Sequence, residues 1–143
     1  MESSELLLHQ LFQTVRIISK GLNKNLESHG IYSSEWSIIT TLHEKGSMPQ
    51  GALANYLNIE PPAVSKSLVK LEQKGLIMRI PGDDKREKKV TLTEKAVDQY
   101  MIWGEIVGHH RKAILTNLSE DKQKEITMLL RGIFQNAQQY EKV

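Results

Sequence analysis

The chain has 143 residues, enough for one compact domain, and its formal net charge is only +2. It contains no cysteine, which excludes disulfides, thiolate metal sites, cysteine nucleophiles and thiol-based redox sensing. The sequence has no apolar run long enough to span a membrane, and its first residues are acidic, unlike those of a signal peptide. We therefore expect a cytoplasmic protein with no membrane partner.

The first part of the chain has the pattern of three helices. An apolar stripe at steps of four and three predicts a helix over residues 5–28, ended by Gly30. The members of this stripe are Leu11, Val15, Ile18, Leu22 and Leu26. Ser33 is the predicted N-cap of a second helix that runs to residue 44. Ser47 and Gln50 have the spacing of a capping box and predict a short third helix.

The positive charge of the chain is concentrated in its middle. Residues 61–93 carry eight Lys or Arg side chains against four acids, a net charge of +4. Residues 1–60 have a net charge of −2, and residues 94–143 are neutral. This distribution suits local binding of phosphates.

The helix predicted from Pro62 to Lys74 has one apolar face and one basic face. At a hundred degrees per residue, Val64, Leu68 and Leu71 share a narrow arc and should anchor the helix in the core. The opposite arc is polar and mostly free of acids, and its side-chain types can contact base edges and phosphates. Its members are Pro62, Ser65, Lys66, Val69, Lys70 and Gln73. Taken alone, this face is equally well explained as an ordinary solvated helix surface.

A short helix precedes this basic helix and a hairpin follows it. The join near residues 58–60 has the length of a helix-turn-helix connection. Residues 76–80 and 89–92 are predicted strands around the turn that begins at Pro81. The hairpin tip carries Asp84, Lys85, Arg86 and Lys88. Arg86 suits a narrow minor groove, and Asp84 is expected to pair with it and hold its orientation.

Two long helices are predicted to complete the chain. Thr93 is the expected N-cap of a helix to residue 117, and Ser119 that of the last helix. The apolar stripes of the terminal helices exceed what a small central core needs, and such faces are usually buried in a partner. The sequence therefore predicts a homodimer formed by the two ends of the chain.

Three segments of the sequence resemble the MarR-type (multiple antibiotic resistance regulator) winged helix-turn-helix transcription regulators. They are the runs 71–77 (LEQKGLI), 84–86 (DKR) and 90–95 (VTLTEK), supported by Leu53, Ala54 and Leu57 in the preceding helix. The element order resembles the family over nearly the whole chain. Two positions depart from its pattern: Ala96 replaces a frequent glycine, and Glu60 stands where a Ser or Thr cap is common.

The resemblance implies a mainly α fold with a small β-hairpin wing. It implies a single domain, 1–143, with a DNA-binding lobe at 33–93 and dimerisation helices at 1–30 and 119–143, joined by part of the helix 94–117. It also implies a homodimeric regulator, a repressor in our interpretation, that binds a pseudo-palindromic double-stranded operator. Arg86 would enter the minor groove with support from Asp84, and Lys66 and Lys70 would lie in the major groove.

The same resemblance implies a small aromatic or phenolic effector bound between the dimer helices and the DNA-binding lobe. The candidate pocket residues are Leu11, Val15, Tyr32, Trp36 and Ile39, although Trp36 and Ile39 are better explained as core. The five histidines lack the i, i+4 pairing of a helical metal site, so we predict no metal and no cofactor. A winged-helix module that binds protein and a metal-responsive regulator remain the alternatives. An enzyme is not expected, because the sequence shows no nucleophile–base or paired-carboxylate motif.

Overall fold

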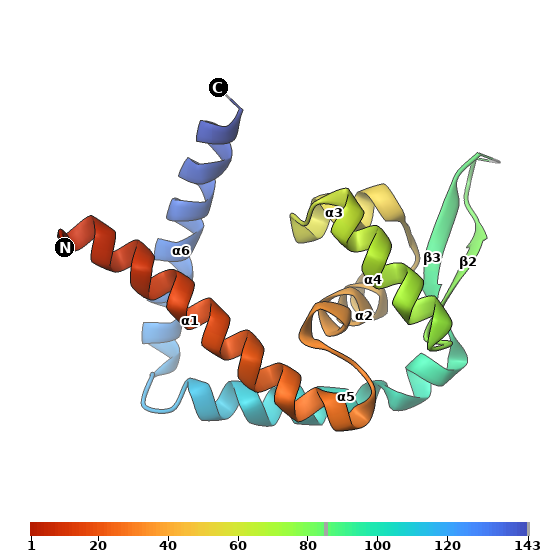
Figure 1. Ribbon diagram of the computed structural model, residues 1–143, viewed down its shortest axis with the longest axis horizontal. Helices are drawn as coiled ribbons and strands as arrows, with labels where there is room; N and C mark the ends of the chain where they lie inside the picture. Colours follow the sequence, from red (N-terminus) through yellow and green to blue (C-terminus); the bar gives the residue numbers. More distant parts are fainter. Residues whose placement is uncertain (85, 143) are drawn as a thin grey trace. The chain divides into compact units, whose positions relative to one another are not determined.

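The computed structural model describes residues 1–84 and 86–142 of the chain. It divides into two compact units, Met1–His110 and Arg111–Val143, which are described separately. None of the described helices is both long and apolar enough to cross a membrane. The architecture is mainly helical with a small antiparallel sheet, which confirms the predicted fold class (Figure 1).

The first unit contains the helix-turn-helix and the wing. In chain order its elements are α1 (Ser3–Leu26), the 3-10 turn η1 (Glu27–His29), α2 (Ser33–Lys45), β1 (Met48–Pro49), α3 (Gln50–Leu57), α4 (Pro61–Gln73), β2 (Ile77–Pro81), β3 (Lys88–Leu92) and α5 (Glu94–Ile114). The last residues of α5 lie in the second unit. In Figure 1, α2, α3 and α4 cluster together, and the hairpin of β2 and β3 projects beside α4.

The sheet has the strand order β1-β3-β2, and both pairings are antiparallel. Ile77 lies opposite Leu92, and Pro81 opposite Lys88, so the hairpin is in register along its whole length. Both strands were predicted within one residue of their observed bounds. The two-residue β1 was not predicted. Met48 pairs with Val90 there, and a two-residue strand leaves no alternating pattern in the sequence.

The core lies where α2, α3, α4, α5 and the sheet meet. It includes the predicted anchors of α4: Val64, Leu68 and Leu71 are essentially inaccessible to solvent. The other buried apolar residues are Leu26, Ile31, Ile38, Ile39, Leu42, Leu53, Ala54, Leu76, Ile77, Val90, Ala96 and Trp103. The indole N–H of Trp103 donates to the carbonyl of His29 at 3.1 Å, which satisfies the polar atom of this buried side chain.

Several helix ends differ from prediction. The first α-helix ends at Leu26 and continues as the 3-10 turn η1, after which Gly30 takes the left-handed conformation (φ 84°). Tyr32, and not Ser33, is the N-cap of α2, because the Glu35 carboxylate accepts the Tyr32 backbone N–H at 2.9 Å. The Ser47–Gln50 capping box does not form. Residues 48 and 49 pair with β3 instead, which makes Pro49 the N-cap of α3.

The second unit contains the end of α5 and the helix α6 (Glu120–Glu141). Its predicted cap is confirmed, since the hydroxyl of Ser119 accepts the backbone N–H of Lys122 at 3.2 Å. Large apolar side chains are exposed along α6. They are Ile126, Met128, Leu129, Leu130 and Phe134.

Candidate nucleic-acid interface

The outer face of α4 carries the side chains predicted to contact DNA. Their helical phase is opposite to that of the buried anchors, so the fold turns them away from the core. Val69, the apolar member of this face, is 47% exposed. The remaining residues of this face are the exposed Pro62, Lys66, Lys70 and Gln73 and the half-buried Ser65.

The start of α4 depends on its prolines and on backbone bonds. Pro61 and Pro62 occupy the first positions, where the missing N–H groups have no intrahelical partner to lose. Glu60 gives no side-chain cap, and its backbone carbonyl instead accepts the N–H groups of Ala63 at 3.0 Å and Val64 at 3.2 Å. The unusual residue at this cap is therefore accommodated without its side chain.

The end of α4 is held more firmly. Gly75 adopts the left-handed conformation (φ 73°) that stops the helix, and the Leu76 N–H returns to the Leu71 carbonyl at 2.9 Å. The Thr93 hydroxyl donates to the Gly75 carbonyl at 2.7 Å and also accepts the Ala96 N–H at 3.3 Å, the predicted cap of α5. One threonine thus joins the end of α4 to the start of α5.

A partly buried ion pair joins α2 to the end of α4, and it was not predicted. Lys74 Nζ lies 2.6 Å from Oε1 and 2.9 Å from Oε2 of Glu35. The two residues are 39 positions apart, and only the tertiary fold brings them together. The sequence near Glu35 shows only an acid in the first turn of a helix, which does not point to a distant lysine.

Arg79 connects the wing to both helices of the helix-turn-helix. From β2, its Nη1 donates to Gln50 Oε1 of α3 at 3.0 Å, and its Nε lies 3.7 Å from Glu72 Oε2 of α4. A planar guanidinium suits such a three-way contact, because its donors point in fixed directions. Arg79 is therefore a structural link in this unit as well as part of its positive charge.

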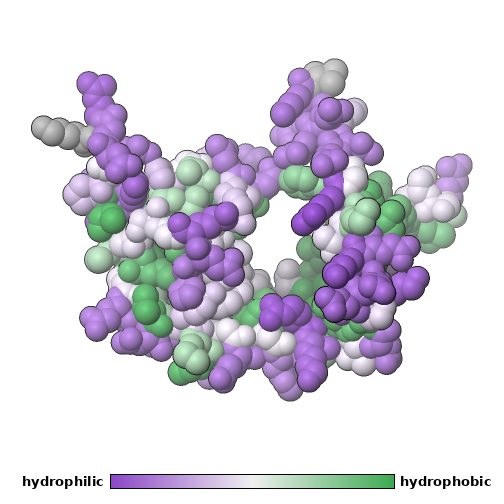
Figure 2. All heavy atoms as spheres, turned by 180° about the vertical axis from the view of Figure 1, so that it is seen from behind, coloured by the Kyte–Doolittle hydropathy of each residue, from purple (hydrophilic) through white to green (hydrophobic). Residues whose placement is uncertain are grey.

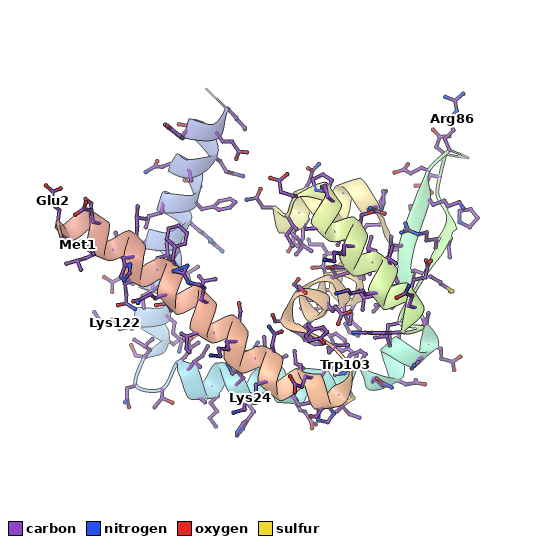
Figure 3. All side chains as sticks on the ribbon, viewed as in Figure 1. Met1, Glu2, Lys24, Arg86, Trp103 and Lys122 are labelled. Carbon is purple, nitrogen blue, oxygen red and sulfur yellow. The ribbon has the colours of Figure 1, made fainter. Side chains whose placement is uncertain are left out.

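The wing tip is closed by backbone bonds and leaves Arg86 free to project. The Gly82 N–H donates to the Glu87 carbonyl at 2.8 Å, and the Asp84 carboxylate accepts the backbone N–H of Arg86 at 3.2 Å. The structure thus gives Asp84 a role in shaping the turn in place of the expected side-chain pair. Figure 3 shows the Arg86 guanidinium pointing away from the tip, and Lys88 is also exposed. Lys85 lies outside the described residues.

Hydrophilic side chains gather at the wing tip, at the upper left of Figure 2. Lys89, at the base of the tip, lies 3.3 Å from Asp83 Oδ2, so part of its charge is locally balanced. Lys66, Lys70, Arg86 and Lys88 form no ion pair within the described part of the chain. These four cations are available to an anionic partner.

The candidate effector residues differ in their burial. Ile39 is fully buried in the core, whereas Val15 and Tyr32 are about half exposed. Trp36 is partly buried against the core, with its ring stacked on Tyr100 at a centroid distance of 5.2 Å. A surface hollow along α1 and the start of η1 includes Val15 and is otherwise lined by polar and charged residues.

The histidines are dispersed. The His43 ring stacks on Tyr100, with the two ring centroids 3.6 Å apart. His110 approaches Gly21, where an added Cβ would lie 3.3 Å from its Nε2. Among residues 1–84 and 86–142, no three His, Asp or Glu side chains are grouped as metal ligands.

The family model of the MarR family matches residues 31–88, the segment that contains the helix-turn-helix and most of the wing. Over 129 residues the chain is 35% identical to the uncharacterized HTH-type transcriptional regulator YwoH of Bacillus subtilis (strain 168). This similarity covers 90% of the chain and 94% of that protein. The chain belongs to the MarR family.

Solved structures agree with this MarR-family fold. The organohalide-sensing regulator RdhR-CbdbA1625, in its 2,4-dichlorophenol-bound form, is similar with a TM-score of 0.87 and 23% identity, covering 95% of this chain and 82% of that one. A mutant MarR from E. coli complexed with operator DNA is similar with a TM-score of 0.80 and 22% identity, covering 91% and 95%.

Membership of the MarR family makes the chain a winged helix-turn-helix DNA-binding transcription regulator, a class that is not enzymatic. Its two departures from the family pattern are both explained by the structure. Ala96 is fully buried in the first turn of α5, where alanine favours the helix. Glu60 acts through its backbone, as described above.

Proposed function

We propose that this MarR-family protein represses transcription as a homodimer bound to a pseudo-palindromic DNA operator. Each protomer would present α4 to the major groove and Arg86 to the adjacent minor groove. Affinity would come largely from phosphates and specificity from base edges. The two recognition helices would lie about one helical turn, roughly 34 Å, apart along the duplex.

The observation that carries this proposal is the pairing of two exposed basic elements in one unit. The outer face of α4 is anchored from behind by Val64, Leu68 and Leu71, so it is rigid as well as polar. The wing beside it carries Arg86 on a turn closed by its own backbone. A fixed helix and a projecting arginine are what simultaneous contact with two grooves requires.

Exposed apolar side chains support the dimer. In α1, Leu6, Leu7 and Phe12 are about half exposed, and in α6 Leu129 and Phe134 are similarly accessible. Large apolar side chains exposed along a helix of a small protein often mark an interface. We assign the dimerisation role to residues 1–30 and 119–143 with part of the helix 94–117, and the DNA-binding role to residues 33–93.

A small aromatic or phenolic effector is the proposed signal. One similar regulator binds 2,4-dichlorophenol, and this chain has aromatic side chains near the start of α2. We propose that Tyr32 and Trp36 contact the effector together with Leu11, Val15 and the neighbouring Ile39. We also propose a cytoplasmic location, because a regulator of this kind acts on chromosomal DNA.

A salt series tests the central proposal and separates it from the alternatives. The protein should retain a duplex from the DNA beside its own gene, and the logarithm of affinity should fall linearly with the logarithm of salt concentration. A protein-binding module would retain no duplex even at low salt. A metal-responsive regulator would change its affinity on addition of zinc or EDTA, and no such change is expected.

A further inference from the structure

Glu35 is a buried acid that lies outside the face of α4 proposed to read DNA. Only 1% of the residue is exposed, and it lies in the first turn of α2. Its Oε1 accepts the backbone N–H of Tyr32 at 2.9 Å and the ammonium of Lys74 at 2.6 Å, and its Oε2 accepts the same ammonium at 2.9 Å. A carboxylate removed from water therefore depends on one distant lysine for its charge balance.

Lys74 is the residue that directly follows α4, and three groups fix it there. Its backbone N–H donates to the Lys70 carbonyl at 3.0 Å, and its carbonyl accepts the ammonium of Lys95 at 2.9 Å. Its own ammonium also lies 5.0 Å from the centre of the Tyr32 ring. The Lys74 side chain thus connects α2 to the last turn of α4, the turn that carries Lys70 and Gln73.

Stability alone is a weak reason for such a pair. Buried ion pairs recover little more than the desolvation of their charges, and apolar residues of similar size often stabilise a protein as well. Apolar contacts, however, tolerate small rotations of a helix. A lysine bonded to both oxygens of a fixed carboxylate restricts such rotations, because its bonds weaken steeply as distance and angle change.

We propose that Glu35 and Lys74 form a positioning pair that fixes the rotation of the last turn of α4, and thereby lets Lys70 and Gln73 distinguish the operator from other DNA. The inference rests on the proposed function for its DNA readout. Glu35 itself touches no DNA, since its side chain is enclosed. Of the two groups that Glu35 binds, the Tyr32 backbone N–H and the Lys74 ammonium, only Lys74 belongs to the end of α4.

The test uses the full chain and the double variant Glu35→Gln/Lys74→Met. Glutamine keeps an oxygen for the Tyr32 N–H, and the two changes leave the net charge unaltered. The matched control is Glu120→Gln/Lys124→Met, which makes the same substitutions in an exposed pair of α6 separated by 3.6 Å. By helical phase this pair lies away from the apolar stripe of α6, so it lies outside the proposed dimer contact. Lys74→Arg is the charge-retaining variant, because a guanidinium can also bond both oxygens of the carboxylate.

The DNA readout is the affinity for a specific duplex divided by the affinity for nonspecific DNA. Both are measured well below the unfolding temperature of every variant. The probes are a duplex selected from a random pool by the wild-type protein and poly(dI-dC). We expect the double variant to lose about ten-fold or more in affinity for the selected duplex. Binding to poly(dI-dC) should stay within about two-fold, and the control and Lys74→Arg should keep the wild-type ratio.

The second readout needs no DNA. Amide hydrogen exchange at residues 70–76 should accelerate in the double variant and not in the control, while amides of the buried part of α2 stay protected. An equal loss of both affinities with uniformly faster exchange would show a purely structural role and overturn the inference. So would an unchanged ratio with unchanged exchange.

Two further outcomes are also decisive. If the wild-type protein selects no duplex, the proposed function fails, and the exchange measurement still decides whether the pair positions α4. If the double variant does not fold, Glu35→Asp replaces it, because the shorter acid keeps its charge and withdraws from Lys74. It should lower the ratio in the same direction, and an unchanged ratio would again contradict the inference.

Discussion

Lys74 and Glu35 meet at 2.6 Å across the interface between α4 and α2, although 39 positions separate them in the chain. The lysine side chain is 30% exposed, whereas the acid is enclosed. Breaking the pair therefore costs more when Glu35 is left without its partner than when Lys74 is. A freed lysine can reach water, but a freed Glu35 cannot.

Lys74→Met should destabilise the fold by about 2 kcal/mol, below the roughly 3–5 kcal/mol of fully buried pairs because water reaches the lysine. Urea unfolding followed by circular dichroism measures this loss. Lys124→Met, which breaks an exposed pair, should change stability by less than about 0.5 kcal/mol. Equal unfolding midpoints for the two variants would refute the expectation.

Arg86→Ala should weaken operator binding by about ten-fold or more and leave stability within about 0.5 kcal/mol. The guanidinium projects from the wing tip and has no core contact to lose (Figure 3). Fluorescence anisotropy with a labelled duplex gives the affinity, and thermal unfolding gives the stability. Arg16→Ala, an exposed arginine of α1, is the control. Equal affinities of the Arg86 variant and wild type would remove this residue from the site.

Gly82→Ala should also weaken DNA binding, because it changes the conformation of the turn that orients Arg86. A Cβ at this position would lie 2.6 Å from the Glu87 carbonyl oxygen, the same atom that accepts the Gly82 N–H. The turn must shift, so affinity should fall several-fold while stability changes by about 1 kcal/mol or less. Gly132→Ala, where a Cβ meets no atom within 4 Å, should leave the gel-shift titration unchanged.

Gln73→Ala should change base preference at particular operator positions. An amide side chain can bond two atoms of one adenine, and losing such a contact costs about 1–3 kcal/mol at that base pair only. Binding to a set of single-base operator variants measures the effect. A uniform loss over all variants would instead identify Gln73 as a phosphate contact.

Phe134→Glu should convert a dimer to monomers at micromolar concentration, as measured by light scattering. The ring is about half exposed on α6, and a charge buried there without a partner would cost about 2 kcal/mol or more of association energy. Met78→Glu, at an exposed apolar position of β2, should leave the mass unchanged. A monomeric wild-type chain under these conditions would contradict dimerisation.

The sequence predicted best those features that depend on neighbouring residues. The threonine before α5 and Ser119 before α6 act within one turn of their own position, and the structure confirms both. The arc of Val64, Leu68 and Leu71 is similarly local, since helix geometry alone places them on one side.

Features that depend on distant partners escaped prediction. Ser47 and Gln50 had the spacing of a capping box, but β3 pairs with the residues between them and sets a different start for α3. The Glu35–Lys74 pair and the contacts of Arg79 have the same origin, because each links elements that only tertiary packing brings together. The candidate effector residues remain a prediction for the same reason.

The surroundings of Trp36 and Trp103 give the protein two different built-in optical signals. Trp103 is shielded from water and its indole N–H is bonded to His29, conditions that shift indole emission to shorter wavelength. Trp36 is partly exposed and stacked on Tyr100 between α2 and α5. Since the chain holds only these two tryptophans, its fluorescence spectrum separates loosening of the α2–α5 contact from melting of the core without any added label.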